Sequence, residues 1–194
     1  MLRKLYDWTL SLAKTRHAER MLAGVSFIES SVFPIPPDVL LVPMVLADRT
    51  KWIRYAAICT IASVLGAYLG YAIGALLYET VGRPVLAFYG LQEVFDDISA
   101  RYNSDWGVWA ILVGAITPFP YKVLTIFSGV TGLNLLTLTL FSIVGRGFRF
   151  FLVGWLLWRF GTPVRLFIER YLGLLFTLFM LLLIGGFVAL RYLV

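Results

Sequence analysis

The feature that most constrains this chain is a series of five long apolar stretches, two of which are broken by prolines. A helix needs about 20 apolar residues to cross a hydrocarbon core of about 30 Å. Residues 52–78, 135–158 and 171–190 provide that length without a proline break. Residues 21–47 and 106–133 are as apolar but contain proline clusters. The pattern predicts an all-α integral membrane protein.

Composition supports this class. Hydrophobic residues make up 60 % of the 194 residues and charged residues 14 %, whereas soluble proteins average about 45–50 % and about 25 %. So few charged side chains leave too little polar surface for a soluble domain. The composition therefore argues against a soluble enzyme, a disordered segment and a nucleic-acid-binding domain. We expect no nucleic-acid partner despite the net charge of +6.

The proline clusters divide two of the apolar stretches into halves. Pro34, Pro36 and Pro37 interrupt the first, and Pro118 and Pro120 interrupt the other. Proline removes a backbone donor and clashes with the preceding helical turn, so neither stretch is expected to form one continuous helix. Each half has about 10–14 residues and is too short to cross alone. We predict two re-entrant helical hairpins, with their irregular backbone surrounded by protein or a water-filled cavity.

The two broken segments are also similar to each other. Residues 34–40, Pro-Ile-Pro-Pro-Asp-Val-Leu, align with residues 118–124, Pro-Phe-Pro-Tyr-Lys-Val-Leu, at a constant offset of 84. Each is followed by a long apolar stretch, which predicts an inverted repeat of hairpin plus transmembrane helix. Repeat 1 covers residues 21–78 and repeat 2 residues 106–158, joined by an amphipathic segment at 79–105. Matching proline-interrupted segments in two halves point to a transporter site near the midplane.

The flanking segments fix the expected orientation. Residues 1–20 predict a basic amphipathic segment, residues 84–102 a surface amphipathic helix, and residues 161–194 a loop and final transmembrane helix. In the hairpin topology, 11 basic residues lie on the side of the N-terminus and three on the other. The positive-inside rule then places the N-terminus on the cytoplasmic side of a bacterial or archaeal inner (plasma) membrane. A topology in which both broken segments cross gives 10 against four, so the rule separates the two topologies poorly.

Five ionisable residues fall inside the apolar stretches: Glu29, Asp38, Lys122, Arg146 and Arg149. A charge at the bilayer centre costs about 2.5–3.5 kcal/mol, so each should face a cavity or a partner. Their charges add to +1, which favours an anionic ligand, and arginine matches phosphate geometry. We predict that Lys122, Arg146 and Arg149 bind a lipid phosphate. Glu29 and Asp38 would bind and release protons, because burial favours the neutral carboxyl.

Other roles remain open for these residues. Asp38 follows a proline turn and can cap the next helix. Glu29 can lie at the surface if its helix is shallow, and the long stem of Lys122 can reach the interface. Arg146 and Arg149, three residues apart on one helix face, can simply form structural salt bridges with Glu29 and Asp38.

Glycines form a smooth face in the stretch at residues 52–78. Gly66, Gly70 and Gly74 recur every four residues, which predicts close packing against another helix and leaves a homo-oligomer open. Cys59 is the single cysteine and His17 the single histidine. A metal cluster or a histidine-assisted nucleophile is therefore not expected, and we predict no metal, no cofactor and no enzyme activity.

Taken together, these motifs resemble the DedA superfamily, also called the VTT or SNARE-associated Golgi protein family. The shared features are Glu29, the Phe-Pro-Ile-Pro-Pro-Asp motif at residues 33–38, the glycine pattern at 66–74 and the second proline-rich hairpin. The short chain, the Pro-Phe-Pro-Tyr-Lys sequence at 118–122 and the Arg146/Arg149 pair are most similar to its YqaA branch. The resemblance covers about residues 20–160.

The resemblance implies opposed re-entrant hairpins and a role in moving lipids. Family members are implicated in undecaprenyl phosphate recycling, phospholipid flipping or scrambling, and tolerance of membrane stress linked to the proton gradient. The acidic residues of the family would correspond to Glu29 and Asp38. One departure concerns the two arginines that typical members carry around the second proline turn. Here Thr117 fills one place, and Lys122 lies beside the other, at Val123.

The expected function is a transporter or scramblase that translocates an anionic lipid, either a phospholipid or a polyprenyl phosphate, with proton coupling left open. Its expected partners are membrane lipids. The first alternative is a non-catalytic membrane-organising protein whose buried charges only pair with one another. The second is an ion or small-solute transporter that uses the same charged site.

Overall fold

The computed structural model describes residues 17–31, 36–116, 121–161 and 163, and these residues form helices and turns with no strand. The predicted all-α fold is confirmed for this part of the chain. Residues 1–16 of the N-terminal segment and the last apolar stretch at 171–190 lie outside the described residues. So do Pro34, Pro118 and Pro120.

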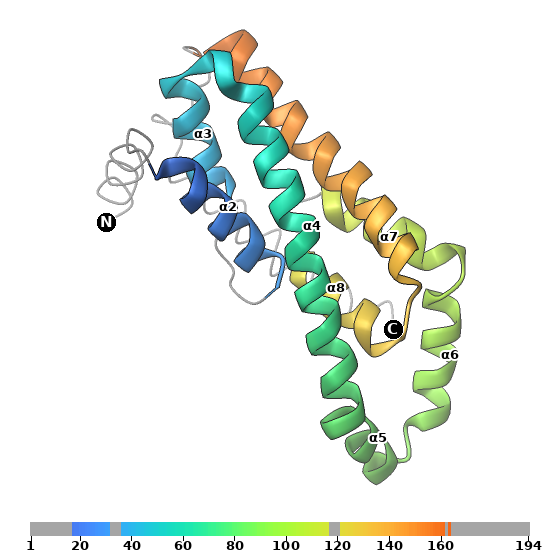
Figure 1. Cartoon of the computed structure of the whole chain (residues 1–194). Helices are drawn as coiled ribbons and strands as arrows, with labels where there is room; N and C mark the ends of the chain where they lie inside the picture. Colours follow the sequence, from blue (N-terminus) through green and yellow to red (C-terminus); the bar gives the residue numbers. More distant parts are fainter. Residues whose placement is uncertain (1–16, 32–35, 117–120, 162, 164–194) are drawn as a thin grey trace.

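The first half of the fold consists of two short helices and one long helix (Figure 1). Helix α2 (Ala18–Glu29) precedes the first proline cluster, and α3 (Asp38–Ala47) follows it. A single 3₁₀ turn, η1 (Arg49–Lys51), leads into the long helix α4 (Trp52–Leu77). Pro37 occupies the N-cap position of α3 with a helical φ of −64°, so the proline cluster ends where α3 begins.

The second half repeats this order after a connecting arm. The arm contains a π-helical turn η2 (Tyr78–Gly82), α5 (Arg83–Tyr89) and α6 (Gln92–Tyr102). The repeated unit contains α7 (Asp105–Ile116), α8 (Tyr121–Val130) and the long helix Leu135–Gly161. The two short helices of this unit flank the second proline cluster.

The prediction of one surface helix over residues 84–102 is wrong, because the arm contains two helices. Gly90 has φ 65°, in the left-handed region that a glycine adopts without strain. Its N–H donates to the carbonyl of Ala87, and the N–H of Leu91 donates to the carbonyl of Leu86. This pairing is the glycine stop signal of a helix C-terminus, and it turns the chain between α5 and α6.

The helix boundaries of the two halves agree closely. Helices α3 and α8 each have 10 residues. The following long helices begin at Trp52 and Leu135, so each starts five residues after the short helix ends. These boundaries of α3, α8 and the two long helices are 83 residues apart, which agrees to within one residue with the offset of the proline motifs.

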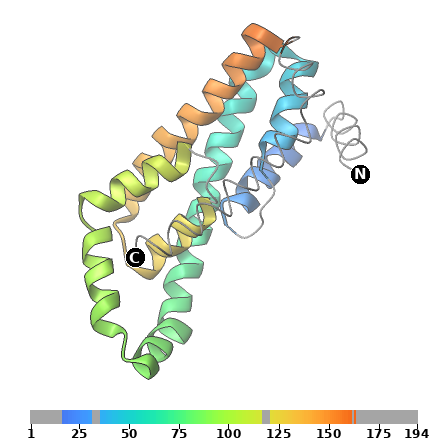
Figure 2. The same ribbon diagram turned by 180° about the vertical axis from the view of Figure 1, so that it is seen from behind.

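The long helices of the two halves lie side by side and run in opposite directions (Figures 1 and 2). The indole of Trp52 stacks on that of Trp158 with ring centroids 6.1 Å apart. Further along, the hydroxyl of Tyr68 is hydrogen-bonded to that of Thr139 at 2.9 Å. The residue numbers rise on α4 as they fall on its neighbour, so the two helices are antiparallel.

The glycine face of α4 lies against two other helices. A Cβ at Gly66 would overlap the backbone carbonyl of Phe27 in α2, and one at Gly74 would overlap the carbonyl of Ile126 in α8. In return, a Cβ at Gly129 of α8 would overlap the carbonyl of Tyr71. The backbones therefore meet without intervening side chains. This face is occupied within the chain.

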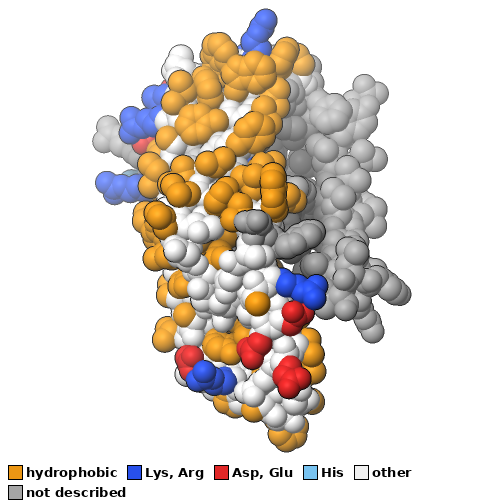
Figure 3. Space-filling view, turned by 90° about the vertical axis from the view of Figure 1, so that its right-hand side faces the viewer, with side chains coloured by type: hydrophobic (Ala, Val, Ile, Leu, Met, Phe, Trp, Pro, Cys, Tyr) orange, Lys and Arg blue, Asp and Glu red, His pale blue; other side chains and the backbone are white. Residues whose placement is uncertain are grey.

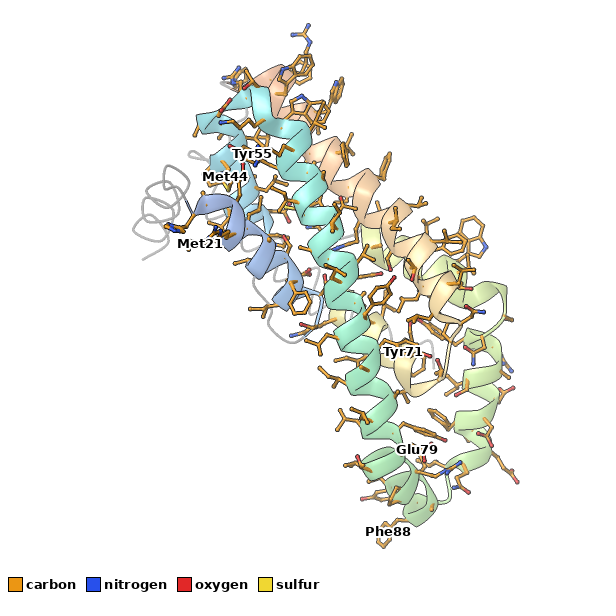
Figure 4. All side chains as sticks on the ribbon, in the orientation of Figure 1. Met21, Met44, Tyr55, Tyr71, Glu79 and Phe88 are labelled. Atoms are coloured by element: carbon orange, nitrogen blue, oxygen red, sulfur yellow. The ribbon has the colours of Figure 1, made fainter. Side chains whose placement is uncertain are left out.

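Two apolar clusters form the core of the described residues. One gathers Leu22, Leu41 and Phe150 with Met44 and Tyr55, at the end where Figure 4 labels Met21, Met44 and Tyr55. The other lies between α4, α7, α8 and the long helix Leu135–Gly161, and its buried members include Ala67, Ile111, Ala115, Tyr121 and Leu138. Arg146 lies between the two clusters, because its guanidinium contacts Tyr121 of one and Phe150 of the other.

Two helical segments of the described chain are long and apolar enough to cross a membrane by length and composition. They are Arg49–Tyr89, with 41 residues from η1 to the end of α5, and Leu135–Gly161, with 27. Their outward faces carry large apolar side chains, and Figure 3 shows such side chains over much of one face of the molecule. Exposed examples on these two segments include Ile61, Leu76, Leu136, Val144 and Phe148.

Candidate functional site

Arg146 is the largest wholly buried side chain among the described residues, with 0 % of its surface exposed. It is the twelfth residue of the long helix Leu135–Gly161. Its Nη2 forms a salt bridge with Oε2 of Glu29, at the end of α2. Nη2 also donates to the hydroxyl of Ser63 at 3.0 Å and to that of Ser30 at 3.3 Å. Nε donates to the same Ser63 hydroxyl at 3.2 Å.

Two aromatic rings lie against the guanidinium of Arg146. The ring centroids of Tyr121, in α8, and of Phe150, one turn along the same helix, are each 4.9 Å from its central carbon. Such cation–π contacts are worth about 2 kcal/mol when the cation is desolvated. The rings occupy space that water would otherwise fill, so the charge is stabilised by Glu29, hydroxyl groups and π-systems.

A second ion pair lies one helical turn away. Nη2 of Arg149 is 2.6 Å from Oδ2 of Asp38, the first residue of α3. These side chains are 17 % and 25 % exposed, compared with 0 % and 12 % for Arg146 and Glu29. The arginines therefore differ in access: Arg149 reaches the surface of the described chain and Arg146 does not.

The structure brings four of the five predicted charged residues into two pairs. Glu29 is largely buried among the described residues, and its carboxylate is paired with Arg146. No side-chain cap bond is present at the start of α3, and the carboxylate of Asp38 contacts Arg149 instead. Lys122 is half-buried in the first turn of α8. Its backbone carbonyl accepts a hydrogen bond of 2.9 Å from the hydroxyl of Thr125.

The sequence reasoning missed the polar residues that complete the surroundings of Arg146. Ser30 donates to Ser63 at 3.1 Å, and its carbonyl accepts from Thr125 at 2.9 Å. Ser63 could have been found, because it precedes Gly66 by three residues and shares its helix face. Ser30 and Tyr121 carry no such signal, since their role depends on contacts with a residue 25 or more positions away in the sequence.

The described residues contain no group of three or more histidine, cysteine, aspartate or glutamate side chains that could hold a metal ion. The chemistry that the site offers is ion pairing and hydrogen bonding. Arg146 provides donors in a rigid plane, Glu29 and Asp38 provide acceptors, and Ser30 and Ser63 can do either. A site of this kind can bind a polar or anionic group inside an apolar body.

The fold and the site together define a class: helical proteins built from two similar halves with ion pairs buried between them. The chain is 36 % identical over 149 residues to an uncharacterized protein of Haemophilus influenzae, covering 77 % of both chains. It is 33 % identical over 149 residues to "Uncharacterized protein HI0703 homolog" of Histophilus somni, again covering 77 % of both. The chain belongs to the family of these two proteins.

A more distant relative carries a more informative name. Over 116 residues the chain is 26 % identical to "Uncharacterized membrane protein YbfM" of Bacillus subtilis, which covers 58 % of this chain and 71 % of the relative. No family profile matches the chain. No solved structure matches it significantly. The resemblance to the DedA superfamily therefore rests on the sequence motifs.

Proposed function

We propose that this chain is a multi-pass membrane protein that translocates an anionic lipid between the two leaflets of a bacterial or archaeal inner membrane. Three observations support membrane insertion. Two helical segments have the length and apolarity of spanning helices. Both expose large apolar side chains outward. The Bacillus subtilis relative is named as a membrane protein.

The distribution of charge supports an orientation with the N-terminal end of α4 in the cytoplasm. Arg49, Lys51 and Arg54 lie at this end, beside the stacked indoles of Trp52 and Trp158. Tryptophan favours the membrane–water interface, and basic residues favour the cytoplasmic side. The opposite end of the molecule carries Glu79 and the acidic helix α6; Figure 3 shows acidic side chains gathered toward that end.

Re-entrant hairpins are part of this proposal. Helices α2, α3, α7 and α8 have only 10 to 12 residues each, about half the length that a spanning helix needs. Each pair flanks a proline cluster, and α2 and α8 pack against the middle of α4 through its glycine face. Short helices held by protein contacts are the form in which interrupted backbone is tolerated within a membrane.

The observation that carries the proposal is the burial of Arg146 at the centre of an apolar helix. Ionisable side chains inside a membrane are costly and mark substrate or ion pathways. Here two arginines from one half of the fold meet two carboxylates from the other half. Arginine is well suited to phosphate, the group that anionic membrane lipids share.

A second candidate function is a membrane organiser whose charges are purely structural. The specific observation in its favour is that both arginines already have carboxylate partners. In that case Arg146 and Glu29 would join the two halves of the fold without exchanging partners. Removing both charges together would then leave the biological role of the protein intact.

Lipid translocation in proteoliposomes tests the proposal. The vesicles would contain a headgroup-labelled phospholipid or an undecaprenyl phosphate analogue, with and without a pH gradient. The parent protein would be compared with Arg146→Met and with Arg101→Met, a control at an exposed surface pair. We expect transport by the parent and by Arg101→Met, and loss of transport in Arg146→Met. Absence of transport of either lipid by the folded parent would favour the organiser or a small-solute transporter.

A further inference from the structure

One nitrogen of Arg146 has no role in the ion pair described above. Nε and Nη2 donate to Glu29, Ser30 and Ser63. Nη1 is buried and has no hydrogen-bond partner within the part of the chain that the structure describes. Because a guanidinium carries two N–H groups on this nitrogen, two donors of a cation are unsatisfied. Leaving buried donors unpaired is unfavourable, and native proteins rarely do so.

In the part of the chain that the structure describes, the hydroxyl groups of Ser63 and Tyr121 are already engaged in other hydrogen bonds. The hydroxyl of Ser63 already accepts from Arg146 and lies 3.4 Å from the carbonyl of Ser26, to which it donates. The hydroxyl of Tyr121, whose ring lies against Arg146, is hydrogen-bonded to Ser142. The acceptor for Nη1 is therefore expected to come from a bound group.

The charges around Arg146 restrict what that group can be. Arg146 and Arg149 are matched by Glu29 and Asp38, so these two ion pairs sum to zero. An oxyanion is attracted to the open edge of a guanidinium, where hydrogen bonds are charge-assisted. Each further negative charge adds repulsion from the two nearby carboxylates, and this repulsion is strong where water is excluded. A single negative charge therefore fits better than two.

We infer that Nη1 of Arg146 binds an oxygen of a singly charged phosphate diester while Nη2 keeps its contact with Glu29. This inference rests on the proposed function and deepens it, because it names the class of headgroup. Phosphate diesters carry one negative charge at neutral pH, whereas phosphate monoesters carry about −1.5 to −2. The site therefore favours a glycerophospholipid headgroup over a polyprenyl monophosphate or free phosphate.

The test observes Arg146 directly in the purified full chain. The protein would be labelled with ¹⁵N-arginine in a phosphate-free detergent, and its buried guanidinium signals followed by NMR. The probes are dihexanoyl phosphatidylglycerol, dihexanoyl phosphatidic acid, glycerophosphoglycerol and inorganic phosphate. We expect the first to shift the Nη signals of Arg146, with an affinity at least about tenfold higher than that of phosphatidic acid or phosphate, equivalent to about 1.4 kcal/mol.

Two variants accompany the titration. Arg146→Lys keeps a cation beside Glu29 but lacks Nη1, so binding of phosphatidylglycerol should fall at least about tenfold. Tyr68→Phe removes a hydrogen bond between the same two long helices, away from Arg146, and should bind as the parent does. If Arg146→Lys does not fold, the comparison of diester with monoester on the parent still decides the inference.

The outcomes are distinct from those of the transport assay. Binding of glycerophosphoglycerol as tight as that of the lipid would keep the diester site but assign it to a free headgroup. Equal or tighter binding of phosphatidic acid or phosphate, or no shift of Arg146 with any probe, would overturn the inference. Transport without a shift at Arg146 would remove only this site, whereas a shift without transport would remove only the transport function.

Discussion

At the scale of single residues, the two ion pairs are expected to differ in their contribution to stability. Replacing Glu29 by glutamine leaves Arg146 charged and wholly buried, and breaking a buried pair in this way costs about 3–5 kcal/mol. Replacing Asp38 by asparagine leaves Arg149 with access to the surface, so the cost should be about 1 kcal/mol. Unfolding of both variants in detergent, compared with the parent, measures the difference.

Equal losses of stability in the two variants would mean that the burial of Arg146 does not increase the contribution of its ion pair to stability. A matched control is Glu79→Gln, which removes one member of an exposed pair with Arg83. This variant should unfold with the parent, because surface pairs contribute little. A Glu29→Gln/Arg146→Met double variant should recover part of the loss, since no unpaired charge remains.

Asp48 gives a prediction about pH. The side-chain hydrogen bonds of Lys51 and Thr50 lower the pKa of Asp48 from 3.8 to about 2. Because the folded-state pKa is the lower one, the stabilisation is fully present above pH 3.8 and is lost as the pH falls through about 2. NMR titration of the Asp48 carboxyl should show this midpoint. Lys51→Met should raise it toward 3.8, and an unchanged midpoint would contradict the assignment to Lys51.

The hydroxyl groups of the buried tyrosines Tyr102 and Tyr121 are internal polar groups that are not hydrogen-bonded to the Arg146 site. Tyr121 is hydrogen-bonded to Ser142, whose hydroxyl donates to the carbonyl of Leu138. Tyr102 is hydrogen-bonded to Ser128 at 2.9 Å, and this serine donates to the carbonyl of Leu124 at 2.7 Å. Both chains of hydrogen bonds end at a helix carbonyl. They satisfy the hydroxyl groups locally and do not extend the Arg146 site.

At the scale of helices, the lengths and ends of the long helices were predictable from the sequence. The long helix α4 has almost the predicted bounds, because uninterrupted apolar sequence and its flanking charges are local signals. The left-handed Gly90, which splits the arm, is not predictable from the sequence, since glycine within an amphipathic pattern also occurs in continuous helices. The partners of Arg146 were only partly predictable. Opposite charge pointed to Glu29, but Ser30 and Tyr121 are specified by packing between distant segments.

The glycine face of α4 gives a prediction at this scale. Gly66→Ala should destabilise the protein by about 1–3 kcal/mol, because the new methyl group overlaps the Phe27 carbonyl and forces α2 away. Gly24→Ala is the matched control, since nothing lies within 4 Å of its Cβ position in the described structure. Alanine there should stabilise α2 by about 0.5–1 kcal/mol. Unfolding measurements on both variants test the contact, which is refuted if they respond alike.

At the scale of the whole molecule, the charged site lies where the two halves of the fold cross. Ser63 is the twelfth residue of α4, and Arg146 is the twelfth residue of the antiparallel long helix. These equivalent residues contact each other directly. When two halves of a fold are related by a two-fold axis, equivalent residues of the two halves contact each other only near that axis. If the proposed inverted repeat holds, the site lies close to its pseudo-two-fold axis, where one half contributes a serine and the other an arginine.

The same symmetry predicts the topology of the chain. The connection before α4 and the one before the long helix Leu135–Gly161 are equivalent in the repeat, and they lie at opposite ends of an antiparallel helix pair. If the proline-broken segments are re-entrant, Thr50 and Asn134 are on opposite sides of the membrane. If both broken segments cross, the two residues are on the same side.

Cysteine labelling in intact cells distinguishes these topologies. Thr50 and Asn134 are exposed, so each would be replaced by cysteine in a Cys59→Ala background and treated with a membrane-impermeant maleimide. We expect the reagent to label Asn134→Cys and to reach Thr50→Cys only after the membrane is permeabilised. Glu93→Cys, in α6, provides the control. Because α4 crosses the membrane between Thr50 and Glu93, these two residues are on opposite sides of the membrane in either topology. Labelling of Thr50→Cys and Asn134→Cys from the same side would exclude the inverted hairpin repeat and leave the charged site without its symmetric setting.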